Sequence, residues 1–225
     1  MCSHYQAIKE RERFIRHFGV MPPDDMGKVD LWPGYIGSFI RRLPGTRADD
    51  DLTPRREALT GLFGLVPHWS PDTKISRLTY NARHETVASK PSFRDAWKRA
   101  QHCIIPAEGI FEPDWRSGRP LPTRISRADG EPMGIAGLWA RWLSPQGDEV
   151  LSYTMLTINA REHALMRQFH KPDDEKRMVV ILPSDGYDAW LEASPEQSSA
   201  LMRHFPARDL VAHGPEIGGA GQRPA

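Results

Sequence analysis

The chain has 225 residues, of which 39% are hydrophobic and 26% are charged. This composition predicts one folded domain with a sizeable core and excludes a wholly disordered chain. Lys and Arg (30) almost balance Asp and Glu (29), so the formal charge is +1, and any site for a polyanion must rest on a local cluster of basic residues.

The first half of the chain alternates apolar runs with segments rich in proline, glycine and charge. Residues that favour helices predict three helical segments: 8–18, 82–87, and 92–100 with Ser92 as its N-cap. Short apolar runs predict three strands: 34–43, 62–66, and 103–111 with a bend at Pro106 and Gly109. The polar stretch 44–56 predicts an exposed connection.

The second half is dominated by apolar runs in close succession, which predict four strands: 123–126, 133–143, 150–158 and 177–182. The separators RADGEP and SPQGDE are typical of hairpin turns. Helical segments are predicted over 161–169 and 184–192, and a disordered tail over 211–225. Because strands follow one another directly, we expect a single α+β domain over 1–210, with a mainly antiparallel, barrel-like β-sheet core and peripheral helices.

Several classes of protein are excluded by simple features of the sequence. Only Cys2 and Cys103 are present, which rules out a disulfide framework. No apolar run reaches the roughly 18–20 residues of a membrane helix, and the amino terminus lacks the apolar stretch of a secretion signal. We therefore expect a cytoplasmic protein.

Cys2 is the most informative residue of the sequence. An initiator methionine is usually removed when the next side chain is small, and the mature chain would then begin with a 1,2-aminothiol. The α-amine has a reference pKa of about 7.7–8.0 and a thiol one of about 8.5, so both groups are partly nucleophilic near neutrality. An aldehyde is the natural partner, because the amine forms an imine and the thiolate then closes a thiazolidine ring. A cysteine in this position also occurs by chance.

The order of motifs along residues 1–192 resembles one family. The motifs are Met1-Cys2, GLVPHW at 64–69, NARHET at 81–86, KPSFR at 90–94, CIIPAEGIFE at 103–112, AGLWARW at 136–142, MLTINA at 155–160, His170 with RMVVIL at 177–182, and DAWLE at 188–192. In this order they resemble the SOS-response-associated peptidase (SRAP) family of abasic-site-processing proteins. The resemblance implies a thiazolidine crosslink between the terminal cysteine and an abasic site in single-stranded DNA, with self-removal of Met1.

The resemblance also implies which residues complete the site. By motif position these are Asn81, Glu112 and His170 beside Cys2. Glu112 can protonate the leaving hydroxyl during imine formation, and His170 can protonate the sugar oxygen as its ring opens. Asn81 can hold the aminothiol or a phosphate through its amide. The ordinary alternatives are a solvent-facing strand glutamate, a structural histidine and a turn or cap asparagine.

Basic and aromatic residues near these motifs are candidates for binding the DNA strand. They are Trp69, Asn81, Arg83, Arg94 and Arg177. Arginine suits bidentate phosphate contacts, and tryptophan suits stacking or wedging at a lesion. The alternative is that the arginines form a solvated face and that Trp69 belongs to the core, as we expect for Trp139 and Trp142. An imine is also the intermediate for strand cleavage, so lyase activity is a natural side reaction.

The chain departs from the family pattern at three places. Ser3-His4 stands where Gly-Arg is usual, so a phosphate-holding arginine is missing, and Pro113 follows Glu112 where an aromatic residue is usual. The segment KPDDEK (171–176) separates His170 from RMVVIL, which are nearly contiguous in the common pattern. His163 is therefore a rival to His170 for the catalytic role, although we favour His170.

Other functions remain open on the sequence alone. One is a cysteine-type hydrolase or autopeptidase that uses Cys2 with His170 or Glu112, and another is a non-catalytic binding module. A metal site from Cys2, His4, His102 and Cys103 matches no strong zinc spacing, so we expect neither metal nor cofactor. We expect a monomer whose partner is single-stranded DNA containing abasic sites, with nucleoid association when DNA is bound.

Overall fold

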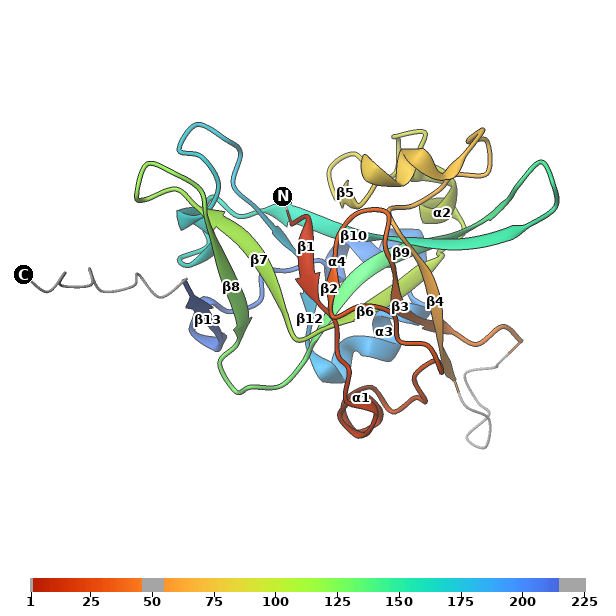
Figure 1. Ribbon diagram of the computed structural model, residues 1–225, viewed down its shortest axis with the longest axis horizontal. Coiled ribbons are helices and arrows are strands. Elements are labelled where there is room, and N and C mark those ends of the chain that lie inside the picture. The colour runs from red at the N-terminus through yellow and green to blue at the C-terminus, as the bar shows by residue number, and fades with distance from the viewer. Residues whose placement is uncertain (1, 46–54, 215–225) are drawn as a thin grey trace, which may run out of the picture.

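A closed β-barrel forms the centre of the computed structural model, which describes residues 2–45 and 55–214 (Figure 1). Its five strands are β3 (Ile36–Arg42), β4 (Arg56–Phe63), β6 (His102–Ala107), β9 (Met133–Leu143) and β10 (Glu149–Asn159). They run in the order β10-β4-β3-β6-β9, and pairing of β9 with β10 closes the ring. All neighbours are antiparallel except β4 and β10.

Three short strands extend the barrel on either side of the β9–β10 pair. They are β5 (Asn81–Arg83), β11 (Arg177–Val179) and β12 (Ile181–Leu182). Both β5 and β11 pair with the end of β10, where Thr157 lies opposite Arg83 on one side and Asn159 opposite Arg177 on the other. The barrel therefore ends in a three-stranded edge, β5-β10-β11, that carries two arginines.

A second, antiparallel sheet packs against the barrel. It has the order β13 (Leu210–His213), β8 (Leu121–Arg127), β7 (Gly109–Asp114), β1 (His4–Gln6) and β2 (Asp30–Leu31). Buried aromatic side chains join the two sheets: the hydroxyls of Tyr5 and Tyr153 are 2.6 Å apart, and the rings of Tyr5 and Phe63 meet edge to face at 5.2 Å. The core consequently lies between β1 and the barrel and fixes where the amino-terminal strand sits.

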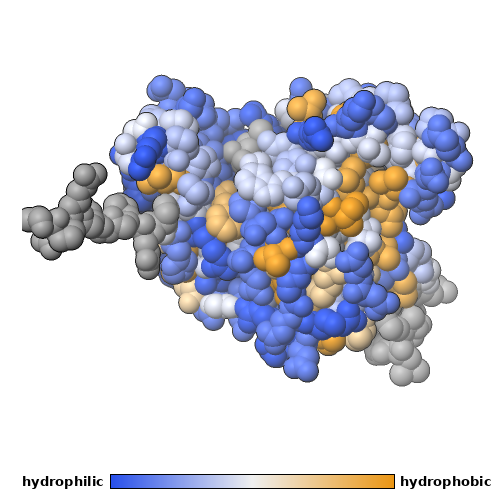
Figure 2. All heavy atoms as spheres, in the orientation of Figure 1, coloured by the Kyte–Doolittle hydropathy of each residue, from blue (hydrophilic) through white to orange (hydrophobic). Residues whose placement is uncertain are grey.

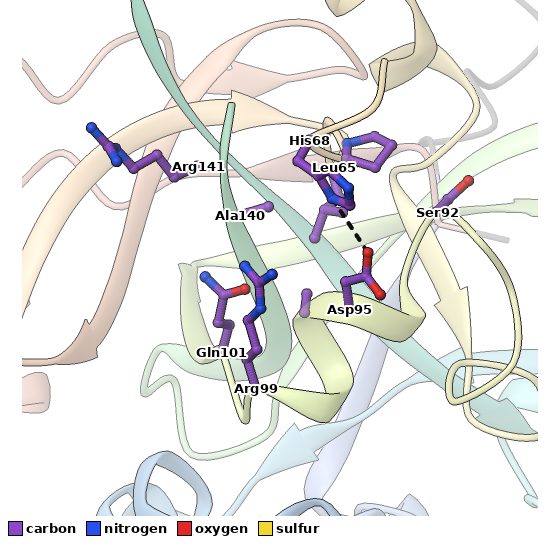
Figure 3. Close-up of a pocket in the computed structure, with 10 residues that line it drawn as sticks. Leu65, His68, Ser92, Asp95, Arg99, Gln101, Ala140 and Arg141 are labelled. Atoms are coloured by element: carbon purple, nitrogen blue, oxygen red, sulfur yellow. Dashed lines mark ion pairs between the residues drawn. The ribbon is translucent and has the colours of Figure 1, made fainter. Parts of the chain in front are cut away.

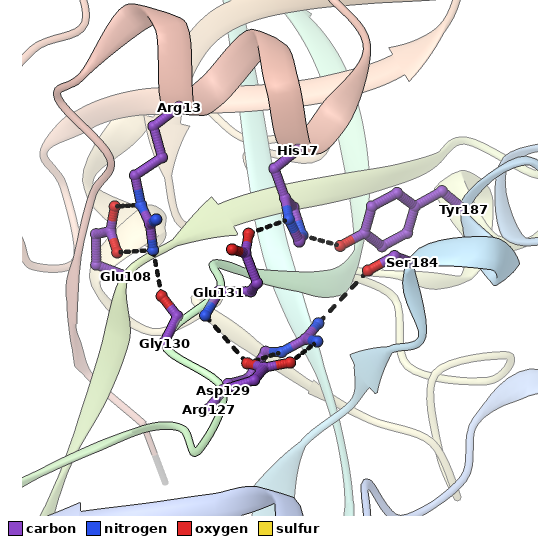
Figure 4. Close-up of polar contacts among 9 residues, drawn as sticks. All are labelled: Arg13, His17, Glu108, Arg127, Asp129, Gly130, Glu131, Ser184 and Tyr187. Carbon is purple, nitrogen blue, oxygen red and sulfur yellow. Dashed lines mark hydrogen bonds and ion pairs between the residues drawn. The ribbon is translucent and has the colours of Figure 1, made fainter.

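Short helices surround the sheets within the described residues. They are α1 (Arg11–Phe18), α2 (Arg94–Lys98), α3 (Tyr187–Glu192) and α4 (Pro195–Leu201). Helix α1 buries Phe14 and Phe18 and is fixed by polar contacts on its other side (Figure 4). Arg13 Nε donates to Glu108 Oε1 at 2.9 Å, and the His17 ring lies 3.1 Å from Glu131 Oε2 and 3.0 Å from the Tyr187 hydroxyl. These contacts tie α1 to α3 and to the β8–β9 connection.

The predicted fold class is confirmed: the chain forms an α+β fold with a mainly antiparallel barrel-like core and peripheral helices. The strand predicted over 133–143 is present with those bounds, and the helix predicted over 8–18 and the strands predicted over 34–43 and 150–158 are present with shifted ends. SPQGDE forms the hairpin expected of it between β9 and β10. The sequence pattern predicted these elements correctly because their long apolar runs all pack on one core.

Several local predictions are wrong. The helix predicted over 161–169 is reduced to the short 3-10 turn Met166–Gln168, and the strand that includes residues 62–66 in the prediction ends at Phe63. RADGEP does not form a hairpin, because the β8 and β9 that it joins belong to different sheets. Residues 103–111 are not one bent strand but parts of β6 and β7, which also lie in different sheets. The helical turn predicted over 82–87 begins as strand β5. Helix α2 begins after Phe93 without a side-chain cap, so Ser92 is not its N-cap.

The predictions at the chain's polar segments are only partly described. Most of the connection predicted over 44–56 and of the tail predicted over 211–225 lies outside the described residues, as does Met1. The domain boundary predicted at residue 210 falls inside β13, which pairs with β8 as far as His213.

Hydrophilic residues cover most of the face shown in Figure 2, and hydrophobic residues gather there in small patches. Among the described residues, no helix has both the length and the apolar character needed to cross a membrane.

Candidate active site

Cys2 lies two residues before β1, the strand between β7 and β2 in the second sheet, and its side chain lies in the core. The residue is 1% exposed, and its thiol donates a hydrogen bond to the carbonyl of His4 at 3.4 Å. Burial and, next, the negative charge of Glu112 raise the pKa of the Cys2 thiol, while hydrogen bonds at the His4 and Phe111 backbone lower it less. The thiol is therefore protonated near neutrality in this state.

Asn81 connects the edge of the barrel to the amino-terminal segment. It is the first residue of β5, which pairs in parallel with Met155 of β10, and its side chain is buried. The amide Nδ2 donates to the backbone carbonyl of Cys2 at 2.7 Å. Oδ1 has no hydrogen-bond partner among the described residues. Asn81 thus holds the backbone of Cys2 and keeps an acceptor in the same buried place.

Glu112 and His170 form a second pair beside Cys2. Both are buried, with His170 Nε2 2.9 Å from Glu112 Oε2. Glu112 belongs to β7, and the residue before it, Phe111, lies opposite His4 of β1. Strand pairing therefore brings the Glu112 carboxyl next to the amino-terminal segment. A carboxyl and an imidazole in contact can pass a proton between them.

The backbone around His170 is tied directly to β7. Phe169 forms a bridge with Asp114, and the His170 N–H donates to the Pro113 carbonyl at 3.0 Å. His170 has φ +65°, a left-handed conformation that is uncommon for a residue with a side chain and that clusters at functional sites. These contacts hold the imidazole over Glu112 even though residues 171–176 follow immediately.

His163, the rival candidate, has a different environment. Its Nδ1 accepts a hydrogen bond from the Met166 N–H at 3.0 Å, and its Nε2 lies 2.8 Å from the Phe205 carbonyl. Both ring nitrogens are thus engaged with the backbone, one at Met166 and the other at Phe205. His4 is also engaged, since its ring is stacked between Trp32 and Phe111 and lies 2.8 Å from Asp30.

Two of the predicted DNA-binding arginines lie together at the edge strands β5 and β11. Arg83 Nη1 is 2.9 Å from Glu175 Oε2, and Arg177 Nη1 is 2.6 Å from Glu175 Oε1. Arg177 also pairs with Glu85, at 2.9 Å between Nη2 and Oε2. Arg83 is half-exposed, whereas the Arg177 side chain is 1% exposed. The sequence contained both acidic residues, in NARHET and KPDDEK, but the pattern alone did not pair them with the arginines.

Trp69 and Arg94 lie on neighbouring segments away from the buried pairs. The Trp69 side chain is exposed, and its indole N–H donates to the Pro91 carbonyl at 3.3 Å. Arg94 is half-exposed at the start of α2, with its Nε 3.7 Å from Asp95. Both side chains are thus partly exposed to solvent.

A small cavity of 60 Å³ lies where GLVPHW meets α2 (Figure 3). His68 Nδ1 is 3.3 Å from Asp95 Oδ2 across it. Its lining includes none of Cys2, Asn81, Glu112 and His170. We interpret this cavity as part of the contact that holds the Trp69 segment on α2.

Several other residues from the sequence analysis are structural. Trp142 is buried and donates from its indole N–H to the Ser70 carbonyl at 2.8 Å, and Trp139 packs on the core next to Phe39, as predicted for both. Cys103 is fully buried in β6. His102 is buried with its ring 4.4 Å from that of Trp190 and its Nε2 2.9 Å from the Ser198 hydroxyl. No group of three or more metal-ligating side chains occurs in residues 2–45 and 55–214.

Tyr80 is a residue at the site that sequence reasoning missed. Burial and then the charges of Cys2 and Glu112 raise the pKa of its phenol, so the hydroxyl lies within electrostatic reach of both groups. Its position directly before NAR in the chain was the only available signal.

The fold and the motif positions coincide with those of one family. The family model for the SOS response associated peptidases (SRAP) matches residues 1–214, and the chain belongs to this family. This membership confirms the resemblance found in the sequence.

Individual relatives cover nearly the whole chain. YoqW of Bacillus subtilis, an abasic site processing protein, is 33% identical over 219 residues, or 95% of this chain and 91% of YoqW. HMCES of Gallus gallus, also an abasic site processing protein, is 28% identical over 92% of this chain and 65% of its own length. A crystal structure of a Bordetella bronchiseptica protein superposes with a TM-score of 0.86 at 46% identity, covering 96% of this chain and 100% of that one.

Proposed function

We propose that this chain processes abasic sites in single-stranded DNA by forming a thiazolidine crosslink through Cys2, after removal of Met1. The observation that carries the proposal is the buried arrangement of Cys2 with Asn81 on its backbone and the Glu112–His170 pair beside it. Membership in the SRAP family and the names of the relatives support abasic-site processing as the general activity.

The first step is attack of the Cys2 amine on the aldehyde carbon of the ring-opened sugar. His170 protonates the ring oxygen as the sugar opens, and the Glu112 carboxylate takes the proton of the C1 hydroxyl, which leaves the aldehyde. The amine then adds to the aldehyde carbon to give a carbinolamine. Glu112 then gives a proton to the hydroxyl, which leaves as water, and an iminium forms. Because the thiol is protonated in the resting state, the amine and not the sulfur makes the first bond.

The second step is closure of the ring by sulfur. The iminium carbon accepts the electron pair of Cys2 Sγ, and Glu112, now a carboxylate, takes the thiol proton. Glu112 then passes this proton to His170, so one water is lost overall and both side chains return to their starting forms. Closure also removes the iminium that would otherwise promote β-elimination of the strand, so we propose lyase activity only as a side reaction.

The DNA strand is held by groups outside the buried site. We propose that Arg83, Arg94 and Arg177 contact phosphates, that Trp69 stacks or wedges at the lesion, and that Asn81 orients the aminothiol. The crosslink would shield the lesion during the response to DNA damage. We propose that the chain acts as a monomer in the cytoplasm, bound to the nucleoid through DNA, and that it removes its own Met1.

The alternative of an ordinary cysteine hydrolase is less well supported. Such an enzyme needs a thiolate activated by a base, whereas burial and a nearby carboxylate raise the pKa of the Cys2 thiol, and His170 contacts Glu112. Acetylation of the terminal amine separates the two functions, because thiol hydrolysis would survive it and ring formation would not.

The decisive experiment is the intact mass of the protein after incubation with a single-stranded oligonucleotide that contains one abasic site. We expect an adduct equal to protein without Met1 plus DNA minus one water, mapped to Cys2. Cys2→Ala, with its amine free, should lose the stable adduct and show more strand cleavage. The matched control is Cys103→Ala, which removes the other thiol from inside the barrel and should retain the adduct.

Two results would overturn the proposal. One is an adduct on a lysine in place of Cys2, and the other is a stable adduct formed by protein that still carries Met1.

A further inference from the structure

The carboxylate of Glu175 lies in a set of donors supplied by three neighbouring strands. Its Oε2 is 2.9 Å from Arg83 Nη1 of β5, and its Oε1 is 2.6 Å from Arg177 Nη1 of β11. Asn159 Nδ2 at the end of β10 donates to the same Oε1 at 3.4 Å. Two cations and an amide converging on one oxyanion have the chemistry of a phosphate site. We call the three donor residues, Arg83, Asn159 and Arg177, the anion cradle.

The cradle is built rigidly on its inner side. Arg177 is 1% exposed, and its Nη2 and Nε donate to the carbonyl and hydroxyl of Thr157 at 2.7 and 3.3 Å. Glu85 covers another part of the same guanidinium. Arg177 cannot swing outward without breaking these bonds, so an external anion must reach it where Glu175 now lies.

The segment that carries Glu175 is attached more loosely. Residues 171–175 are exposed, and an open hollow of 720 Å³ separates the end of this segment from Arg161, Arg167 and Gln168. Apart from Glu175, two lysines anchor this segment: Lys176 Nζ donates to the carbonyls of His170 and Lys171 at 3.3 and 2.5 Å, and Lys171 Nζ lies 5.1 Å from the centre of the Trp115 ring. The Arg83–Glu175 pair is half-exposed and contributes little stability. Arg177 keeps Glu85 as a partner when Glu175 leaves, so the Glu175 contacts can be exchanged for those of another anion.

We propose that Glu175 is an internal competitor for a backbone phosphate of the DNA strand, and that a phosphate must displace it from the anion cradle for full binding. This inference rests on the proposed function and adds its regulation. The apparent affinity for DNA is proportional to the fraction of molecules in which Glu175 does not occupy the cradle. Strands that cannot place a phosphate there would gain nothing from displacing it.

The test uses fluorescence anisotropy to compare how tightly the wild type and the Glu175 variants bind a short oligothymidylate. The oligonucleotide is undamaged, so no covalent chemistry is involved. We expect Glu175→Gln to bind roughly tenfold more tightly than the wild type. The slope of log affinity against log salt should steepen by about 0.7, because one more phosphate is neutralised by a free cation. Glu175→Ala should behave alike.

The matched control is Asp174→Asn, which makes the same change in charge one residue away. No side-chain partner of Asp174 occurs among the described residues. The affinity of Asp174→Asn for oligothymidylate should therefore stay within about twofold of the wild-type value. Equal effects of the two substitutions would mean that only the overall charge determines the affinity, and would overturn the proposal that Glu175 competes with phosphate. Unchanged or weaker binding by folded Glu175→Gln would overturn it as well.

Two further measurements complete the test. One examines displacement of Glu175 in the wild-type protein, without any substitution, and the other tests the proposed function separately. In the wild-type protein, amide hydrogen exchange over residues 171–176 should become faster when oligothymidylate binds, and unchanged or slower exchange would contradict displacement. The second measurement is adduct formation by the wild-type protein at saturating abasic oligonucleotide. Absence of any adduct would reject the proposed function, while the anisotropy comparison would still decide the competitor.

Discussion

At the scale of single residues, Glu112 is the group that links proton transfer and thiol reactivity in the proposed chemistry. Its carboxylate contacts His170 at 2.9 Å, and its negative charge raises the pKa of the Cys2 thiol. In the proposed chemistry it both donates and accepts a proton. Removing its charge should therefore affect the two processes in opposite directions.

Glu112→Gln should slow adduct formation roughly 100-fold, since general acid–base catalysis of this kind contributes factors of about 10² or more. The same substitution should make Cys2 react faster with iodoacetamide at a given pH, because the thiol pKa falls when the neighbouring negative charge is lost. Mass spectrometry follows both reactions. Glu149→Gln, at the exposed end of the β9–β10 hairpin, is the control; a parallel loss of both reactivities in Glu112→Gln would indicate a structural role instead.

His102 predicts a dependence of stability on pH. Burial lowers its pKa from 6.5 to about 4, so the folded state resists protonation that the unfolded chain accepts. The stabilisation is complete above pH 6.5 and is lost as pH falls from there to about 4, by roughly 3 kcal/mol. Urea unfolding at several pH values should show this loss in the wild type and a smaller one in His102→Gln. Identical pH profiles would contradict the assignment.

At the scale of elements, Gly64 determines how strand β4 leads into the segment that carries Trp69. It has φ +116°, and a Cβ there would lie 1.9 Å from the backbone oxygen of Ser76. The motif GLVPHW therefore begins with glycine because the chain passes against 73–77 with no room for a side chain. The position of the exposed indole depends on this close approach.

Gly64→Ala should lower the free energy of unfolding by about 3 kcal/mol or more, because backbone must move to accommodate the methyl group. The matched control is Gly147→Ala in the β9–β10 turn, which has φ +94° but nothing within 4 Å of the added Cβ. Its cost should be about 1 kcal/mol, from conformational strain alone. Thermal or urea unfolding measures both, and equal costs would refute the steric explanation.

At the scale of the whole molecule, the balance of charge limits how DNA can be attracted. The chain carries a formal charge of +1, and several arginines on its surface are already paired with carboxylates. Long-range attraction is accordingly weak, and in the proposed function the local arginines must provide the affinity. Cys2, Glu112 and His170 are buried, which separates the proposed chemistry from this outer surface.

Non-covalent binding of undamaged single-stranded DNA should therefore be modest and sensitive to salt. With about three phosphates neutralised, log affinity should fall with log salt with a slope near −2, so that a fourfold rise in salt weakens binding by more than tenfold. Anisotropy titrations at several salt concentrations measure the slope. A crosslink formed beforehand should persist at high salt, whereas affinity independent of salt would exclude phosphate contacts.

Much of the fold was predictable because it depends on local patterns. The strands β9 and β10 were recognised from long apolar runs on either side of SPQGDE, which is a hairpin turn. RADGEP has similar composition, yet the chain there passes from one sheet to the other and the turn is fixed by contacts with α1 (Figure 4). Composition describes the turn itself and not the sheet that each arm joins.

The sequence by itself determined the family and singled out Cys2 as the proposed reactive residue, because motif order and the place of Cys2 are properties of the chain. Only the tertiary structure decided the environment of each group: strand pairing brings β7 to β1, the 169–114 bridge holds His170 over Glu112, and three edge strands enclose Glu175 between Arg83 and Arg177. Burial and charge at these positions arise from residues far apart in the chain. Their effects on protonation and binding become definite only when the register of the strands is set.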